Sequence, residues 1–271
     1  MAFDDPSTAI TAGEREASLS PIVELRQYVL HPGARDTLTR LFDREFVESQ
    51  EALGIALIGQ FRDVDDPDRF VWIRGFPDMA LRLEALRGFY EGPVWAAHRE
   101  AANATMLNSD DVLLLRPADA ASGFTPSSND RPPPGVNGNG AGLVVATIHA
   151  LDSPASDGFA EYFEHKLKPA LIEAGVAVLA YFVTEMSVND YPRLPVREGE
   201  NVFTWFAGFP DRSGVDRAIP GHGAVERLIG GAPSLRWPPH VLRLIPTARS
   251  LLTGLSQPCA AMSSRRRDGS T

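Results

Sequence analysis

Glutamate, arginine and tyrosine alternate in one short run of the sequence, where they would share one side of a strand. Glu24, Arg26 and Tyr28 are spaced two residues apart in VELRQYVL, so their side chains point to the same face of an extended chain. Trp72 and Arg74 share a face in the same way within FVWIRGF. Such a group can bind and polarise a carboxylate or an enolate. The alternative is a structural ion pair of Glu24 with Arg26 or Arg74.

Histidine is the second candidate for acid–base chemistry. His98 lies close to Trp95 and Arg99 on a predicted helix, and its ordinary pKa of about 6.5 is near neutral pH. The alternative is a half-exposed histidine on a helix packing surface. Glu161 and His165 are four residues apart and could share a metal ion, but a solvated pair is the better interpretation, and we expect no metal site.

A long polar and aromatic segment, SVNDYPRLPVREGEN at 187–201, follows a predicted strand in the second half of the chain. Its two prolines stiffen it, and it carries Tyr191 and Arg193. Three roles are open for such a loop. It covers a pocket, where Tyr191 and Arg193 touch a substrate, or it grips a partner, or it acts as an arm that stabilises a homodimer.

The elements that must position these residues occur twice along the chain. Three segments of the first half have counterparts in the same order in the second half, which indicates an internal duplication. The pairs are GIALIGQF at 54–61 with GVAVLAYF at 175–182, FVWIRGFPD at 70–78 with FTWFAGFPD at 203–211, and VLLLRP at 112–117 with VLRLIP at 241–246.

Hydrophobic periodicity predicts the order strand, helix, strand, strand, helix, strand in each half. In the first half an apolar stripe over 34–53 predicts a helix that ends at Gly54, and Pro77-Asp78 begins the next one. Each unit leaves one apolar sheet face that must be covered. The predicted fold class is therefore α+β, with two tandem ferredoxin-like (βαββαβ) units packed sheet to sheet within one chain.

Segments rich in Pro, Gly, Ser and Asn divide the chain. We expect residues 1–20 and 251–271 to be disordered and residues 118–142 to form a flexible linker, since they offer little to bury. The folded units are then residues 21–117 and 143–250.

Charge and composition narrow the classes of partner. The chain of 271 residues has 35 acidic against 26 basic residues, a formal charge of −9, so we expect no binding to nucleic acid. The N-terminus lacks the basic and apolar regions of a signal peptide, and no apolar run approaches the roughly 20 residues of a membrane span. With a single cysteine, Cys259, a cytoplasmic location is the expectation.

One set of residues together resembles a known family. Glu24-Leu25-Arg26 with Tyr28, then Pro32-Gly33, Trp72, Arg82, and Gly92-Pro93 with Trp95 are similar to the NIPSNAP pattern of the dimeric α/β-barrel superfamily. The second half matches more weakly, because it has Val145, Thr147 and His149 where the first half has Glu24, Arg26 and Tyr28. The resemblance implies a tandem NIPSNAP protein whose two units form an intramolecular dimeric α/β barrel.

The resemblance also implies a small-molecule pocket, with the first half as the better candidate. Relatives in the superfamily include cofactor-free monooxygenases, haem-degrading enzymes and small isomerases, so one hypothesis is a monooxygenase-type enzyme acting on an aromatic or polyketide-like substrate. The expected catalytic residues are His98 and Arg74. The expected substrate-binding residues are Tyr28, Arg26, Trp72, Trp95, Tyr191 and Arg193.

Two further hypotheses stay open. Because no complete catalytic constellation is visible, the protein can also be a non-catalytic binding or protein-interaction module, alone or as a homo-oligomer. No cofactor is expected; the alternative is haem, with His98, His149 or His165 as its axial ligand.

Overall fold

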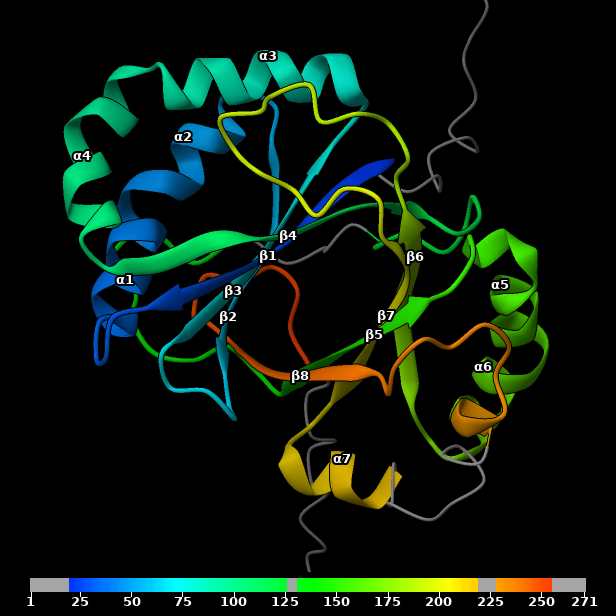
Figure 1. Ribbon diagram of the computed structural model, residues 1–271. Helices are drawn as coiled ribbons and strands as arrows, with labels where there is room; N and C mark the ends of the chain where they lie inside the picture. The colour runs from blue at the N-terminus through cyan, green and yellow to red at the C-terminus, as the bar shows by residue number, and fades with distance from the viewer. Residues whose placement is uncertain (1–19, 126–130, 219–227, 255–271) are drawn as a thin grey trace, which may run out of the picture.

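The computed structural model describes residues 20–125, 131–218 and 228–254 of the chain. Eight antiparallel strands form a closed barrel in the order β1-β3-β2-β8-β5-β7-β6-β4 (Figure 1). The first half contributes β1 (Ile22–Leu30), α1 (Arg35–Leu41), the π-helical turn η1 (Phe42–Phe46), α2 (Val47–Glu51), β2 (Ala56–Asp63), β3 (Arg69–Phe76), α3 (Met79–Tyr90), α4 (Pro93–Asn103) and β4 (Met106–Pro117). The second half contributes β5 (Leu143–Leu151), η2 (Ala155–Asp157), α5 (Phe159–Tyr162), the π-helical turn η3 (Phe163–Leu167), α6 (Lys168–Glu173), β6 (Ala177–Thr184), β7 (Asn201–Phe209), α7 (Arg212–Ala218) and β8 (His240–Pro246).

Helix boundaries in the first half follow the local signals in the sequence. Gly54 adopts a φ of 82° after the α1–α2 stretch, a conformation that favours glycine, and this confirms the predicted helix end. The carboxylate of Asp78 accepts a hydrogen bond from the backbone N–H of Leu81 at 2.7 Å and caps α3. Pro93 stands at the start of α4, where its missing N–H costs nothing.

The two halves are joined edge to edge. β2 pairs with β8 through Phe61 and Pro246, and β4 pairs with β6 through Leu115 and Thr184. Both seams are antiparallel, so the main-chain hydrogen bonds run around the closed barrel. The prediction of a mixed α/β fold with an intramolecular barrel is confirmed in this form.

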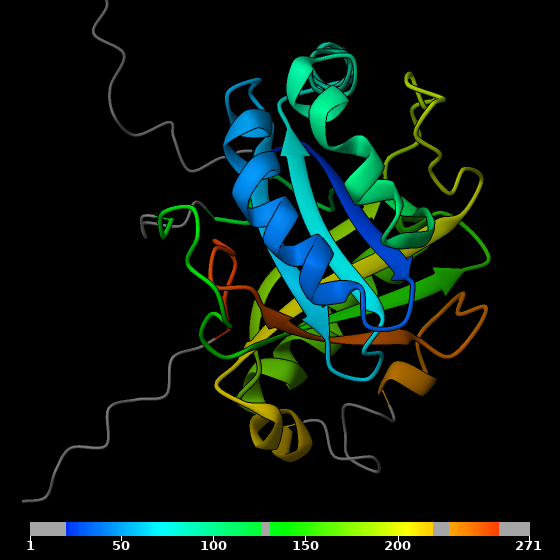
Figure 2. The ribbon, with the colours of Figure 1, turned by 90° about the vertical axis from the view of Figure 1, so that its left-hand side faces the viewer.

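Strand β1 separates two cores. Val23 and Leu25 point into the barrel and pack with residues of both halves, such as Phe206. Glu24 and Tyr28 alternate with them and point outward, beneath the helices. Figure 2 shows the α1–α2 segment and α4 lying across the outer face of the first-half strands.

The described part of the 118–142 segment is packed against the barrel, which differs from the expected flexible linker. Phe124 lies 5.0 Å, centroid to centroid, from both Phe182 and Phe206 in the barrel core. Arg131 donates a hydrogen bond to the Leu57 carbonyl at 2.8 Å. One aromatic ring and one arginine thus join the described parts of this Pro- and Gly-rich segment to the barrel.

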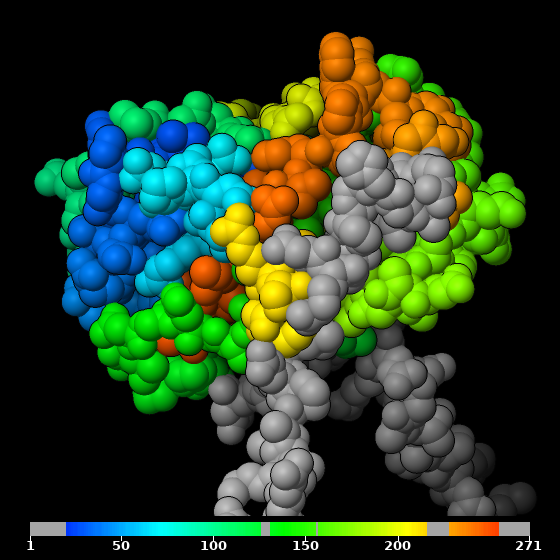
Figure 3. Space-filling model, turned by 90° about the horizontal axis from the view of Figure 1, so that it is seen from below, coloured from blue at the N-terminus to red at the C-terminus, as the bar shows by residue number. Residues whose placement is uncertain are grey.

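Most of the expected disordered segments, 1–20 and 251–271, lies outside the described residues, as does Cys259. Their described ends are packed against the fold: Ser20 is buried, and the N–H of Leu252 donates to the Ile58 carbonyl at 2.8 Å. Seen from below, the two halves form one continuous body, and the described residues 228–254, coloured orange to red, lie between the halves and over the second one (Figure 3). None of the helices in the described ranges is both long and apolar enough to cross a membrane.

Candidate functional site

A cavity of about 250 Å³ lies in the first half, between the outer face of the sheet and the helices above it. Its floor includes Tyr28 from β1 and Trp72 from β3, which meet edge to face with ring centroids 5.9 Å apart. Most of the wall is aromatic, and the rings present are Phe42, Phe46, Phe89, Tyr90 and Trp95. Such a lining favours a flat, largely apolar ligand.

The helical walls follow from spacing along the α1–α2 segment. Phe42, Phe46 and Gln50 are four residues apart and face the sheet together, with the π-helical turn between Phe42 and Phe46. Phe46 packs on Trp95 of α4 with centroids 5.6 Å apart, and Trp95 packs on Tyr90 of α3 at 5.0 Å. Three helices thereby hold one continuous aromatic wall.

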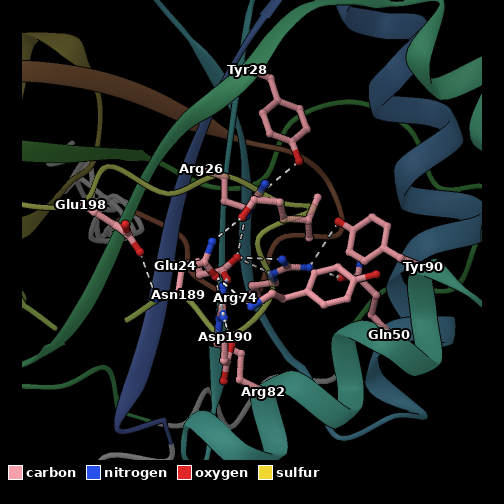
Figure 4. Close-up of polar contacts among 12 residues, drawn as sticks. Glu24, Arg26, Tyr28, Gln50, Arg74, Arg82, Tyr90, Asn189, Asp190 and Glu198 are labelled. Atoms are coloured by element: carbon pink, nitrogen blue, oxygen red, sulfur yellow. Dashed lines mark hydrogen bonds and ion pairs between the residues drawn. The ribbon is translucent and has the colours of Figure 1, made fainter. Parts of the chain in front are cut away.

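Behind the floor lies a fully buried ion network centred on Glu24. One of its carboxylate oxygens accepts hydrogen bonds from Arg26 and Arg74, each at 2.7 Å, and the other accepts one from Arg82 at 2.8 Å. All four side chains are at most 1% exposed. A buried carboxylate is tolerated because three guanidinium groups surround it (Figure 4).

The surroundings set the protonation of the acidic groups. Burial by itself raises the pKa of Glu24, but Arg74, Arg26 and Arg82 outweigh it and hold the pKa well below its ordinary value, so the carboxylate is charged. Burial also raises the pKa of Tyr28, and the opposing effect of Arg26 does not cancel it. Tyr28 therefore keeps its proton.

Two phenol groups connect this network to the cavity. Tyr28 Oη accepts a hydrogen bond from Arg26 Nε at 3.1 Å, and Tyr90 Oη lies 3.5 Å from Arg74 Nη1. Arg74 also donates to the Gln50 side-chain oxygen at 3.1 Å. Tyr28, Tyr90 and Gln50 all line the cavity, so they stand between a ligand and the guanidinium groups.

The second half covers this cavity with residues 185–200, here called the strap, which connects β6 to β7 (Figure 1). Tyr191 stacks on Tyr90 with centroids 6.2 Å apart, and Leu194 lines the cavity. Asp190 pairs with Arg82, while Asn189 accepts a second hydrogen bond from Arg82 at 3.2 Å. The strap is thus tied directly to the buried ion network.

The NIPSNAP family model matches residues 23–121, which lie in the first half of the chain. Residues 23–121 form a NIPSNAP domain. The predicted resemblance is confirmed for this part of the chain. The matched range contains every residue of the ion network except Asp190, which the strap supplies.

Solved structures share the fold beyond the NIPSNAP domain. Two proteins named "putative monooxygenase", from Lactobacillus acidophilus NCFM and from Fusobacterium nucleatum, both align over 88% of this chain with a TM-score of 0.51, at 13% and 10% identity, and over 100% and 97% of their own chains. A NIPSNAP family protein from Agrobacterium tumefaciens aligns over 36% of this chain and 93% of its own, at 24% identity and a TM-score of 0.34. Curated proteins give no match.

The predicted site residues fall into three groups in and around the NIPSNAP domain. Tyr28, Trp72, Trp95, Tyr191 and Arg193 line the cavity. Arg26 and Arg74 lie behind it, within the ion network and in contact with the Trp72 ring. His98 contacts the Phe46 ring with centroids 6.3 Å apart, and its Nε2 lies 3.5 Å from a carboxylate oxygen of Glu45; it is not among the residues that line the cavity. The roles assigned to these residues stay predictions.

The other histidines considered as ligands lie in the second half. His149 is fully buried, and its Nε2 accepts a hydrogen bond from Trp205 Nε1 at 3.0 Å. Burial lowers the pKa of His149 to about 4. His165 is exposed. Within the described ranges, no three His, Cys, Asp or Glu side chains come together as a metal site would require.

Three important residues of the site were missed from the sequence. Gln50 continues the Phe42 and Phe46 spacing, and a polar residue in an apolar helix stripe is a signal that could have revealed it. Tyr90 comes directly after the apolar residues that predict a helix, and no spacing or motif in the sequence marks it as a site residue. Asp190 could not be paired with Arg82 from sequence alone, because they are 108 residues apart.

Proposed function

We propose that the protein binds a small aromatic, polyketide-like molecule in the cavity of the NIPSNAP domain and acts on it as a monooxygenase-type enzyme without a bound cofactor. The observation that carries this proposal is the aromatic cavity whose polar groups, Tyr28 and Tyr90, are backed by buried guanidinium groups. Apolar walls with a few placed donors are typical of small-molecule sites.

The chemistry is balanced without an external reductant. Dioxygen can convert a CH₂ group flanked by aromatic rings into a carbonyl: one oxygen atom enters the product and the other leaves as water with the two hydrogens. The substrate supplies all the electrons. In this scheme the protein holds the ring system between Trp72 and Trp95 and stabilises charge on the substrate oxygen.

A non-catalytic binding module is the second candidate, and one observation favours it. Of the titratable groups described around the cavity, only tyrosines and Arg193 line it, and His98 lies outside the wall. A general base would then have to come from the substrate or from water.

We also propose that residues 143–250 are a second NIPSNAP-like unit. Its support is internal: β1 and β5 differ by 121 residues, and so do the two π-helical turns, η1 and η3. In both halves the first strand also pairs with the third in antiparallel register.

Ligand binding tests the proposal first. 1,8-Dihydroxyanthraquinone, which cannot undergo the oxidation, should raise the melting temperature in a concentration-dependent way. Trp95→Leu should weaken binding at least tenfold, whereas Trp237→Leu, at a 65% exposed position away from the cavity, should not. Equal effects of the two variants would refute the assigned cavity.

Turnover separates the two candidates. 1,8-Dihydroxyanthrone offered to the purified protein should be consumed with one molecule of dioxygen per molecule of quinone formed, faster than in buffer. Binding of the anthraquinone together with no acceleration of anthrone oxidation would favour the non-catalytic module.

A further inference from the structure

The hydroxyl protons of two cavity tyrosines have a direction fixed by their neighbours. A guanidinium group has only donors, so the oxygen of Tyr28 must accept from Arg26, and the oxygen of Tyr90 must accept from Arg74. Each phenol therefore has its own O–H free to donate elsewhere. Both tyrosines line the cavity, and Figure 4 shows their hydroxyl groups turned toward the two guanidinium groups.

The network behind these phenols carries unbalanced positive charge. Three buried guanidinium groups surround the single buried carboxylate of Glu24, and among the residues that the structure describes the other acid paired with them is Asp190 on the strap. One positive charge is left over when the strap is closed. Arg26 and Arg74, which contact the phenols, are the members of the network that Asp190 does not pair with.

From these two observations we infer that the cavity binds its ligand through a phenol or enol oxygen held by Tyr28 and Tyr90, and that it binds this oxygen preferentially as the anion. This inference rests on the proposed function and specifies the chemical class of its ligand. A donor polarised by a cation strengthens most toward a charged acceptor, so the anion gains more than the neutral form.

Burial works in the opposite direction, since it penalises a charged ligand. Glu24 shows which effect is larger in this part of the molecule. Its carboxylate is completely buried and is still held in the charged form by the same arginines. A ligand oxygen at the phenols would be one group further from the guanidinium groups, and the cavity is open to solvent through its mouth, so the penalty is also smaller there.

A chromogenic phenol tests the inference on the unmodified protein. The absorption of 4-nitrophenol reports its ionisation directly, and 4-nitroanisole is its methyl ether, which cannot ionise. We expect the apparent pKa of bound 4-nitrophenol to be lower than in water by at least about one pH unit, which corresponds to tenfold tighter binding of the anion.

The tyrosines are tested by removal of their hydroxyl groups. Tyr28→Phe and Tyr90→Phe keep the rings, so 4-nitroanisole should bind as before while the pKa shift of 4-nitrophenol is reduced in each single variant and lost in the double variant. Tyr162→Phe is the matched control, because its hydroxyl group donates to the Leu228 carbonyl away from the cavity and the shift should persist.

The outcomes separate this inference from the function on which it rests. Binding of both probes with no pKa shift, or binding of 4-nitroanisole alone, would overturn the anion preference and leave an aromatic pocket. Failure of both probes to bind would overturn the pocket and the inference together. A shift that survives in the double variant would overturn the role of the two tyrosines.

Discussion

At equivalent positions, the two halves of the barrel carry different kinds of side chain. The residues of the ion network in the first half, Glu24, Arg26, Arg74 and Arg82, correspond to Val145, Thr147, Ala207 and Val215 in the second half. These four replacements are all buried. One half therefore keeps three arginines and a carboxylate under its helices, and the other keeps small or apolar side chains in the same places.

The space above the sheet differs in the same way. In the second half the helices bring Phe159 and Phe163 onto the strands, where Phe163 lies 4.7 Å from Phe203 and 6.1 Å from Trp205. The indole N–H of Trp205 is satisfied by His149. Trp72, at the equivalent position, instead lines a cavity. Over the described residues, the second half thus fills the space above its strands with aromatic side chains, whereas the first half leaves a cavity there.

Removal of the Glu24 carboxylate should cause the largest loss of stability among the changes at equivalent positions of the two halves. Glu24→Gln leaves three buried guanidinium groups with no buried counterion, so we expect the free energy of unfolding to fall by about 3–5 kcal/mol. Denaturant unfolding followed by circular dichroism measures this loss. Val145→Ala, at the equivalent position of the second half, is the control and should cost less.

The charged residues of the network can also be replaced together by apolar residues, as in the second half. Glu24→Leu combined with Arg26→Met, Arg74→Met and Arg82→Met removes the four fully buried charges of the ion network while it keeps similar volumes. We expect this variant to be more stable than Glu24→Gln and to have lost its preference for anionic ligands. A combined variant less stable than the single one would show that the network itself stabilises the fold.

Acidification should destabilise the folded protein through His149, the buried histidine of the second half. The pKa of His149 falls to about 4 in the folded protein because of burial, against about 6.5 when unfolded. The unfolded state then binds more protons between these values, so the stability is complete above pH 6.5 and is lost as the pH falls toward 4, by up to about 3 kcal/mol.

His149→Gln keeps an acceptor for Trp205 but cannot titrate, so its stability should change less across this window. His165→Gln changes an exposed histidine and should leave the slope as it is. Chemical denaturation at a series of pH values measures all three proteins. An unchanged slope in His149→Gln would assign the acid sensitivity to another group.

Asp43 and Glu164 occupy equivalent positions in the two halves, and their pKa values shift in opposite directions. Asp43 in the first half corresponds to Glu164 in the second; burial raises the pKa of Asp43 to about 6. Burial also raises the pKa of Glu164, but its hydrogen bonds with Lys168 and Tyr181 outweigh this and leave the pKa below its ordinary value. The folded state therefore favours protonated Asp43, and this contribution is lost as the pH rises from about 4 through 6.

Asp43→Asn removes the cost of ionising a buried carboxyl and should stabilise the protein at pH 7 by about 1–3 kcal/mol. Glu164→Gln should instead be mildly destabilising at the same pH. Thermal unfolding at pH 7 and at pH 4 compares them. A stability gain of Asp43→Asn that is as large at pH 4 as at pH 7 would contradict the ionisation account.

More of the barrel than of the site could be predicted from the sequence. Repeated strand segments and the alternation of Glu24, Arg26 and Tyr28 identify which residues lie under the helices, because strand periodicity is local. The ion network depends on contacts between strands and helices that are far apart, such as Glu24 with Arg82, and on Asp190 of the other half. Local patterns contain no information on such pairs. His98 was proposed from its ordinary pKa, which says nothing about whether its side chain lines the cavity.

The smallest expected effect concerns the strap, which links the halves. Asp190 is the member of the strap that pairs with buried Arg82, and its side chain is 23% exposed. Asp190→Asn keeps an oxygen acceptor but removes the charge, so we expect a loss of about 1 kcal/mol in stability. Faster hydrogen exchange should be confined to residues 185–200, together with faster ligand dissociation.

A control is available at the far end of the strap. Arg197 pairs with Asp111 at 3.1 Å in a partly exposed position, so Asp111→Asn should change ligand dissociation little. If both variants accelerate exchange and ligand release equally, the strap opens as one unit and Arg82 is not its latch. If only Asp190→Asn does so, the second half controls access to the pocket of the first through a single ion pair, and the two halves have to be considered as one functional unit.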